Sequence, residues 1–112
     1  MSVTLFYGKL ANGEVKYLAI PIHDHTIGLH IAWLDAVSSA AIVLEMAGNA
    51  DVSASTAGTA AQWKDSGVTV TGPTATAIDS ALLNIDNVRQ AQARLKITAA
   101  AVCYLDITDS LG

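Results

Sequence analysis

Residues 26–34, which have the sequence T-I-G-L-H-I-A-W-L, show the clearest alternation in the chain. Large apolar side chains occupy every second position, at Ile27, Leu29, Ile31 and Trp33. Successive side chains of a β-strand point to opposite faces, so a period of two is typical of a strand with one face in a core. We therefore predict a strand here and expect Trp33 to be central to the core.

Short segments with strand character lie on both sides of this stretch. They cover residues 3–7, 15–22, 41–46, 61–64, 68–71 and 99–108, and turn formers such as Asp65-Ser66-Gly67 separate them. Seven or eight short strands with turns between them predict an all-β fold, either an antiparallel β-sandwich or a jelly-roll-like barrel. The chain has no βαβ pattern and no internal repeat.

Residues 1–25 contain the pair Asn12-Gly13 between two apolar segments. Asn-Gly is the favoured pair of two-residue type I′ hairpin turns, because both central residues of that turn need a positive φ. The sequence thus predicts an N-terminal β-hairpin from Val3 to Ile22. Pro21 cannot donate a ladder hydrogen bond, so we expect its strand to lie at an edge or to end there.

Two segments are less regular. Residues 47–61 are small and polar without periodicity, which predicts a long surface loop that is either functional or mobile, or is ordered by a neighbouring molecule. Residues 78–95 place Ile78, Leu82, Ile85 and Val88 at helical spacing, yet turn formers interrupt them. We favour a turn near Asp86 followed by a strand, with a helix as the alternative.

Composition indicates one domain, spanning residues 1–112, with ample material for a core. Hydrophobic residues make up 52% of the chain and charged residues 14%, against roughly 25% in an average soluble domain. The mean hydropathy of +0.41 is high for a small monomer, so we expect part of the apolar surface to face partners. The 20 alanines offer another explanation, because alanine raises hydropathy without making a surface adhesive.

Charge and segment lengths argue against several classes of protein. The net charge is −4 and the four Lys and two Arg are scattered, which disfavours direct nucleic-acid binding. Apolar runs are far shorter than the roughly 20 residues that span a bilayer. The first residues lack the features of a secretion signal, so we expect folding in a cytoplasm. Cys103 is a single cysteine in an apolar segment, where we expect a small buried hydrophobe.

Few residues suggest a ligand site. His23 and His25, with His30 nearby, could supply two metal ligands, but a third would have to come from elsewhere, and a turn with a polar tip explains the same residues. Asn49, Asp51 and Glu45 lack the spacing of a calcium loop. There is no nucleophile elbow and no phosphate-binding glycine motif. We therefore predict no enzymatic activity, no catalytic or metal site and no cofactor.

The two tryptophans have different surroundings. Trp33 belongs to the apolar face described above, whereas Trp63 lies among polar residues and is expected to be half exposed. An exposed tryptophan can stack on a sugar, although packing at the core or its rim is the simpler role.

The order of features from Gly28 onwards resembles small β-sandwich virion proteins of tailed bacteriophages, including capsid decoration or cement proteins. The matching pieces are GLHIAW at 28–33, AIVLE at 41–45, QWKDSG at 62–67, ARLKIT at 93–98 and AVCYLDI at 101–107. They are loose motifs without a diagnostic signature, and no functional residue is carried over.

The resemblance implies a non-enzymatic structural protein on the capsid surface of a virion, made in the host cytoplasm. Its partners would be the major capsid protein and copies of itself, with a homotrimer favoured. The N-terminal hairpin and the long loop are the candidate contact elements. The alternatives are a tail- or fibre-associated protein and a carbohydrate-binding β-sandwich module.

Overall fold

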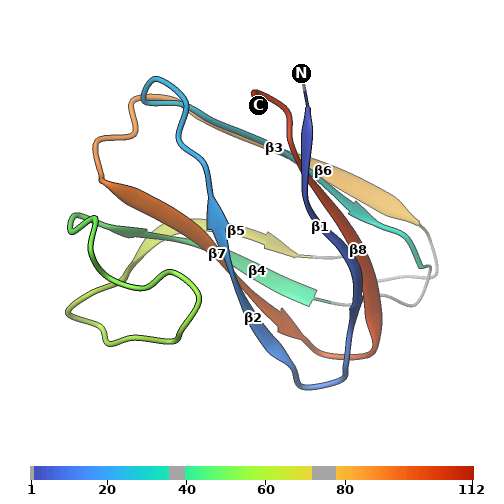
Figure 1. The fold of residues 1–112 in the computed structure, drawn as a ribbon. Coiled ribbons are helices and arrows are strands. Elements are labelled where there is room, and N and C mark those ends of the chain that lie inside the picture. Colours follow the sequence, from blue (N-terminus) through green and yellow to red (C-terminus); the bar gives the residue numbers. More distant parts are fainter. Residues whose placement is uncertain (1, 36–39, 72–77) are drawn as a thin grey trace.

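Eight β-strands make up the fold in the computed structural model, which describes residues 2–35, 40–71 and 78–112 (Figure 1). The strands are β1 (Val3–Leu10), β2 (Val15–Ile20), β3 (Ile27–Trp33), β4 (Ala40–Ala47), β5 (Lys64–Thr71), β6 (Asp79–Ile85), β7 (Gln92–Ala99) and β8 (Cys103–Asp109). They form two antiparallel four-stranded sheets, which confirms the predicted β-sandwich. The described ranges contain no helix long and apolar enough to cross a membrane.

The strand order is that of a jelly roll. One sheet has the order β1-β8-β3-β6 and the other β2-β7-β4-β5. The pairs β1 with β8, β2 with β7, β3 with β6 and β4 with β5 are nested, as in one long hairpin rolled over itself. Rolling adds the pairs β3 with β8 and β4 with β7. The segment 48–63, between β4 and β5, is therefore the tip of this rolled hairpin.

The predicted N-terminal hairpin is wrong, although both of its strands exist. β1 pairs with β8 in one sheet and β2 with β7 in the other. Glu14 N–H donates to Ala11 O at 3.0 Å across the turn, where Gly13 alone has a positive φ, of 83°. One positive φ at the third turn residue fits a type II turn, which lacks the twist of a hairpin. Ala99 exchanges backbone hydrogen bonds with Gly13 and Glu14, which fixes this corner between the sheets.

The tight turn with two left-handed residues lies instead at residues 23–26. Asp24 and His25 have φ of 48° and 64°, and His23 and Thr26 exchange two backbone hydrogen bonds of 2.8 and 2.9 Å. This is type I′ geometry built without glycine. The turn interpretation of these histidines is thus confirmed.

Two other predictions have mixed outcomes. A turn after β6 followed by strand β7 is confirmed, and the helix alternative over 78–95 is wrong. The two short strands predicted at 61–64 and 68–71 are one strand, β5, which begins only at Lys64. The expected turn at 65–67 is a bulge inside it, where Gly67 has a φ of 83° and Ser66 Oγ donates to Leu44 O at 2.6 Å.

The core lies between the sheets and consists of the alternating apolar faces of the inner strands. Trp33 is 2% exposed, as expected from its position in the alternation. The fully buried large side chains around it include Leu29, Ile31, Ile42, Leu44, Leu95, Ile97, Leu105 and Ile107. Both sheets contribute, so neither can bury its apolar face alone.

The corner between β1 and β2 is tested by two substitutions. Gly13→Ala is expected to lower the free energy of unfolding by about 1 kcal/mol, because an L residue resists a positive φ even in open space. Asn12→Gly is expected to lower the free energy of unfolding by about 0.5 kcal/mol, because Asn12 does not have a positive φ whose strain a glycine would relieve. Chemical denaturation measures both. If Asn12→Gly stabilised the protein, the turn would be of type I′, and the assignment of a type II turn at the corner between β1 and β2 would be wrong.

Candidate functional site

The most unusual side chain of the outer surface is Arg94 on β7. Its neighbours Ala93 and Leu95 point into the core, so Arg94 lies on the outer face of the sheet. It is nevertheless only 1% exposed, whereas Lys96, the next residue on that face, is partly exposed. The loop 48–63 folds over Arg94 and excludes water from it.

The guanidinium of Arg94 is bound on all sides by the chain itself. Its Nε donates to Glu45 Oε1 at 2.8 Å, and its two terminal nitrogens donate to the carbonyl oxygens of Ala54, Thr56 and Ala57. Arginine presents five N–H donors in a planar fork, which suits several carbonyls at once. Since Glu45 balances its charge, the buried cation is paired as well as hydrogen-bonded.

Two aromatic rings complete the enclosure. The guanidinium carbon of Arg94 lies 4.3 Å from the centroid of the Tyr17 ring and 4.1 Å from that of Trp63. Trp63 also donates from Nε1 to Ser53 O at 3.1 Å and is 5% exposed. The expectation of a half-exposed Trp63 is therefore wrong, because the loop and Arg94 bury it. A ring whose face is taken by a guanidinium does not offer that face to a sugar.

Further hydrogen bonds fasten the beginning of the loop. Gln92 donates to the carbonyl oxygens of Asn49 and Val52 at 3.0 and 2.8 Å, and Asn49 Oδ1 accepts from Asp51 N–H at 2.8 Å. Asn49 thus caps a turn and Glu45 binds Arg94, instead of gathering as calcium ligands. The long loop is held by its own sheet along most of its length.

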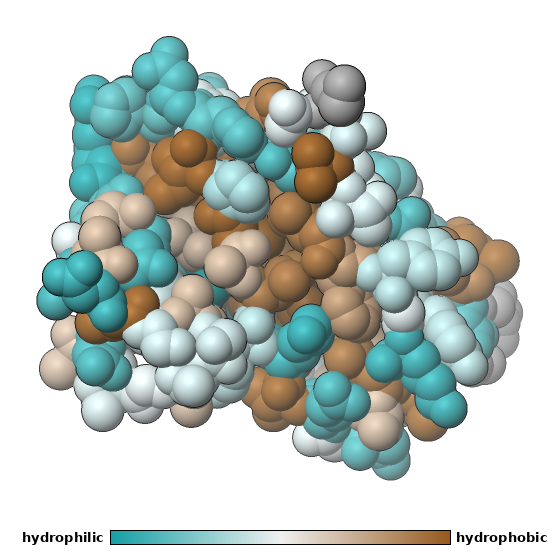
Figure 2. All heavy atoms as spheres, viewed as in Figure 1, coloured by the Kyte–Doolittle hydropathy of each residue, from teal (hydrophilic) through white to brown (hydrophobic). Residues whose placement is uncertain are grey.

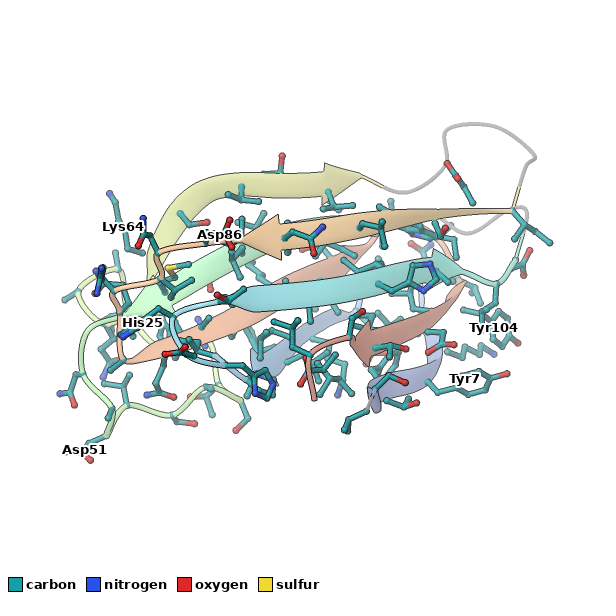
Figure 3. All side chains as sticks on the ribbon, turned by 90° about the horizontal axis from the view of Figure 1, so that it is seen from above. Tyr7, His25, Asp51, Lys64, Asp86 and Tyr104 are labelled. Carbon is teal, nitrogen blue, oxygen red and sulfur yellow. The ribbon has the colours of Figure 1, made fainter. Side chains whose placement is uncertain are left out.

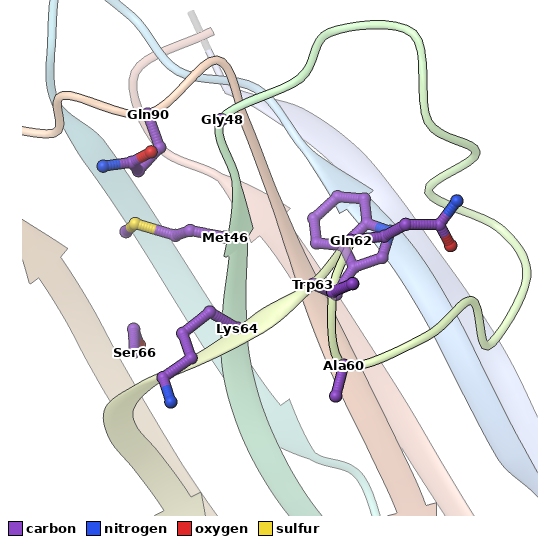
Figure 4. A pocket seen from close by; sticks show the side chains of 9 residues that line it. Met46, Gly48, Ala60, Gln62, Trp63, Lys64, Ser66 and Gln90 are labelled. Carbon is purple, nitrogen blue, oxygen red and sulfur yellow. The ribbon is translucent and has the colours of Figure 1, made fainter.

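Two hollows flank the loop. The first, of about 490 Å³, has Met46, Lys64 and Gln90 on its wall, and no carboxylate, histidine or cysteine among its lining residues (Figure 4). The second, of about 450 Å³, lies over the outer sheet face and is lined by Tyr17, Trp63 and charged groups that include the Arg94 and Glu45 pair.

The three histidines are held apart by different partners. His23 Nε2 lies 2.6 Å from Asp109 Oδ2, and His25 Nδ1 lies 3.1 Å from Val88 O. His30 sits on the outer face of β3, between Thr108 and Leu82 of the neighbouring strands. Over residues 2–35, 40–71 and 78–112, no three His, Cys, Asp or Glu side chains come together as a metal site.

The Asp109 carboxylate anchors the end of β8. Its burial opposes ionisation, but hydrogen bonds from His23 and from the backbone N–H groups of Leu111 and Gly112 outweigh this, and the pKa of Asp109 lies below its ordinary value of 3.8. An ionised carboxylate only accepts hydrogen bonds, so the Nε2 of His23 carries the proton. Leu111 then lies over Gly28, where an added Cβ would come within 2.9 Å of the leucine side chain.

Cys103 is fully buried, which confirms that it serves as a small core residue. Burial, together with the nearby charge of Glu14, raises the pKa of its thiol. A buried thiol with a raised pKa is a poor nucleophile.

Sequence reasoning missed the two interactions that organise the surface. Arg94 occupies a polar position of an alternating strand, where an exposed side chain is the ordinary expectation. The pair of His23 and Asp109 joins residues 86 positions apart, which no local pattern indicates. Comparison of the chain with known protein families, with curated proteins and with solved structures finds no match.

Arg94→Lys tests the attachment of the loop. Lysine keeps the charge but cannot reach Glu45 and three carbonyls together, so we expect unfolding to become easier by about 2–3 kcal/mol and the loop 48–63 to become sensitive to protease. Lys96→Arg, on the same face of the same strand, is the matched control and should stay within about 0.5 kcal/mol of wild type. Equal behaviour of the two variants would contradict this role of Arg94.

Acidification tests the Asp109 anchor. Because the folded pKa of Asp109 is lowered, its contribution to stability is present above the ordinary value of 3.8 and is lost as pH falls through the folded pKa. Denaturation from about pH 6 to about pH 2 should show a smaller loss for Asp109→Asn than for wild type. Two profiles with the same slope would exclude this carboxylate as a source of the acid sensitivity.

Proposed function

We propose that this protein is a non-enzymatic structural component of a virion, a capsid decoration protein that binds the outside of a phage head and stabilises contacts between major capsid subunits. Jelly rolls occur in viral capsid proteins, lectins and cupins, so the fold alone does not choose among these roles. The choice rests on the surface.

The observation that supports the proposal is an apolar N-terminal face, formed by β1 and β2 with the adjacent part of β8. Figure 2 shows hydrophobic side chains gathered in a band between the two sheets on this side. Partly buried apolar residues on this side of the molecule pack against the core. They include Leu5, Phe6, Leu18 and Ile22. The same strands carry exposed apolar residues on their outer faces: Tyr7 and Tyr104 lie on the outer face of the sheet that contains β1, and Val15 lies on that of the sheet that contains β2.

Two tyrosines stand at the rim of this face. Tyr7 on β1 is 71% exposed, and Tyr104 on the neighbouring strand β8 is 40% exposed. Both side chains project away from the sandwich and lie side by side in Figure 3. Tyrosine is enriched in protein interfaces because it combines a large apolar ring with a polar tip. A rim of this kind suits a protein partner.

A rigid body also suits a decorating role. The attached loop and the buried Arg94 leave few side chains to order on binding, which reduces the entropic cost of association. A weak contact in each copy is sufficient, because many copies on one particle act together through effective concentration.

Purified particles test the proposal. We expect the protein to copurify with heads in many copies, and heads without it to lose their DNA at a lower temperature. Particles that lack the protein altogether would overturn the proposal. Recovery with tails alone would replace the head location by a tail location.

Addition of variants to bare heads tests the N-terminal face. Tyr7→Lys is expected to weaken binding at least tenfold, because it replaces the exposed aromatic ring opposite Asp106 with an ammonium group. Ile78→Lys is the matched control, since Ile78 is 68% exposed and precedes β6 at the opposite edge of the sheet. Equal loss in both variants would place the contact elsewhere.

A further inference from the structure

The sandwich has four edge strands, and three of them carry features that hinder pairing with another chain. An edge strand presents unpaired backbone N–H and C=O groups, which proteins protect with bulges, charges, prolines or short strands. β1 has a register shift between Thr4 and Phe6, and β5 has the bulge around Gly67. β2 is six residues long, contains Lys16 and is followed by Pro21.

Strand β6 has no bulge and no proline. It pairs with β3 over all seven residues without a register shift, and its sequence DSALLNI has one charge, at its first position. Among the strands that the structure describes, none pairs with its other side, which is an edge of the sheet. Leu82, at the middle of the strand, is 71% exposed.

The backbone of β6 shows which groups face the free edge. Ser80 N–H donates to Asp79 Oδ1 at 2.8 Å, so it points away from β3. Backbone groups alternate between the two sides of a strand, and the N–H and C=O groups of Ser80, Leu82 and Asn84 therefore share that free side. Leu82 and Asn84 can each donate and accept a hydrogen bond with an antiparallel strand, and Ser80 can accept one at its C=O.

We propose that β6 pairs with the β6 strand of a second copy of this chain, antiparallel and centred on Leu82. In that register Leu82 meets itself and Ser80 meets Asn84, which makes about four backbone hydrogen bonds while the Ser80 N–H of each copy stays with Asp79. The contact is isologous and has two-fold symmetry. It joins two four-stranded sheets into one continuous sheet.

The side chains are compatible with this register. The two exposed Leu82 side chains cover one another on the outer face. Asp79 comes opposite Ile85, so no like charges lie directly opposite one another. On the inner face Ala81, which is partly buried against the core, comes opposite Leu83 of the other copy.

This inference concerns β6 and stands apart from the virion proposal, which rests on the N-terminal face. A two-fold pair also differs from the trimer that the resemblance to decoration proteins implies. The mass in solution distinguishes the two assemblies.

Light scattering of the purified full chain tests the pairing. We expect twice the 11.6 kDa mass of one chain. Leu82→Lys places two ammonium groups opposite one another and should raise the dissociation constant at least tenfold, with the thermal transition of the monomer preserved. Tyr7→Lys is the matched control, because Tyr7 is also 71% exposed on the outer face of the same sheet, and it should remain paired.

Cysteine cross-linking tests the register. Residues opposite one another in a hydrogen-bonded antiparallel pair have Cα atoms about 5.5 Å apart, which permits a disulfide. Leu82→Cys should therefore link into a covalent dimer under mild oxidation. Ser80→Cys should not, because the two copies of that residue are roughly 13 Å apart in this register. Cys103 is buried and gives no background.

Several outcomes would overturn the proposal. They are a wild-type protein that remains monomeric at every concentration, a trimeric mass, dissociation by Tyr7→Lys to the same extent as by Leu82→Lys, or equal cross-linking at positions 80 and 82. If the protein forms the dimer but does not bind virus particles, only the virion proposal is contradicted, and the β6 pairing stands.

Discussion

The packing of the long loop depends on one buried cation. The Arg94 guanidinium reaches the outer face of its sheet, where it binds Glu45, three loop carbonyls and two aromatic rings. A buried arginine without these partners would be strongly destabilising, so the loop and the side chain require each other. The same contacts bury Trp63, which lines both hollows, so they determine the shape of the surface beside the loop.

The position of this interaction in the fold explains its importance. In a rolled hairpin the segment between β4 and β5 is the tip, the one place where strands adjacent in sequence are also adjacent in a sheet. Every other described pairing joins strands that are distant in the chain, which costs more loop-closure entropy. Because the tip is anchored, β4 and β5 are held in register. The strand pairs that enclose them in the nested hairpin, β3 with β6, β2 with β7 and β1 with β8, can then form around this first pair.

Local patterns predicted the strands but not their partners. Alternation around Trp33, the turn near Asp86 and the buried Cys103 could be derived from the sequence because burial and turn chemistry act over a few residues. The Asn12-Gly13 turn was misassigned to a hairpin, since a turn sequence does not state whether the next strand stays in the same sheet. Trp63 was expected near water, and Arg94 was not singled out, because only a tertiary contact, the loop, buries them.

The described surface presents exposed apolar side chains, among them Tyr7 and Leu82, and the edge strand β6. The hydrogen bonds of Arg94 fix the long loop to the sheet, and backbone amide relaxation by NMR tests this most directly. Residues 48–63 are expected to have order parameters of about 0.85, like the strands. Values below about 0.6 along the loop would contradict the account.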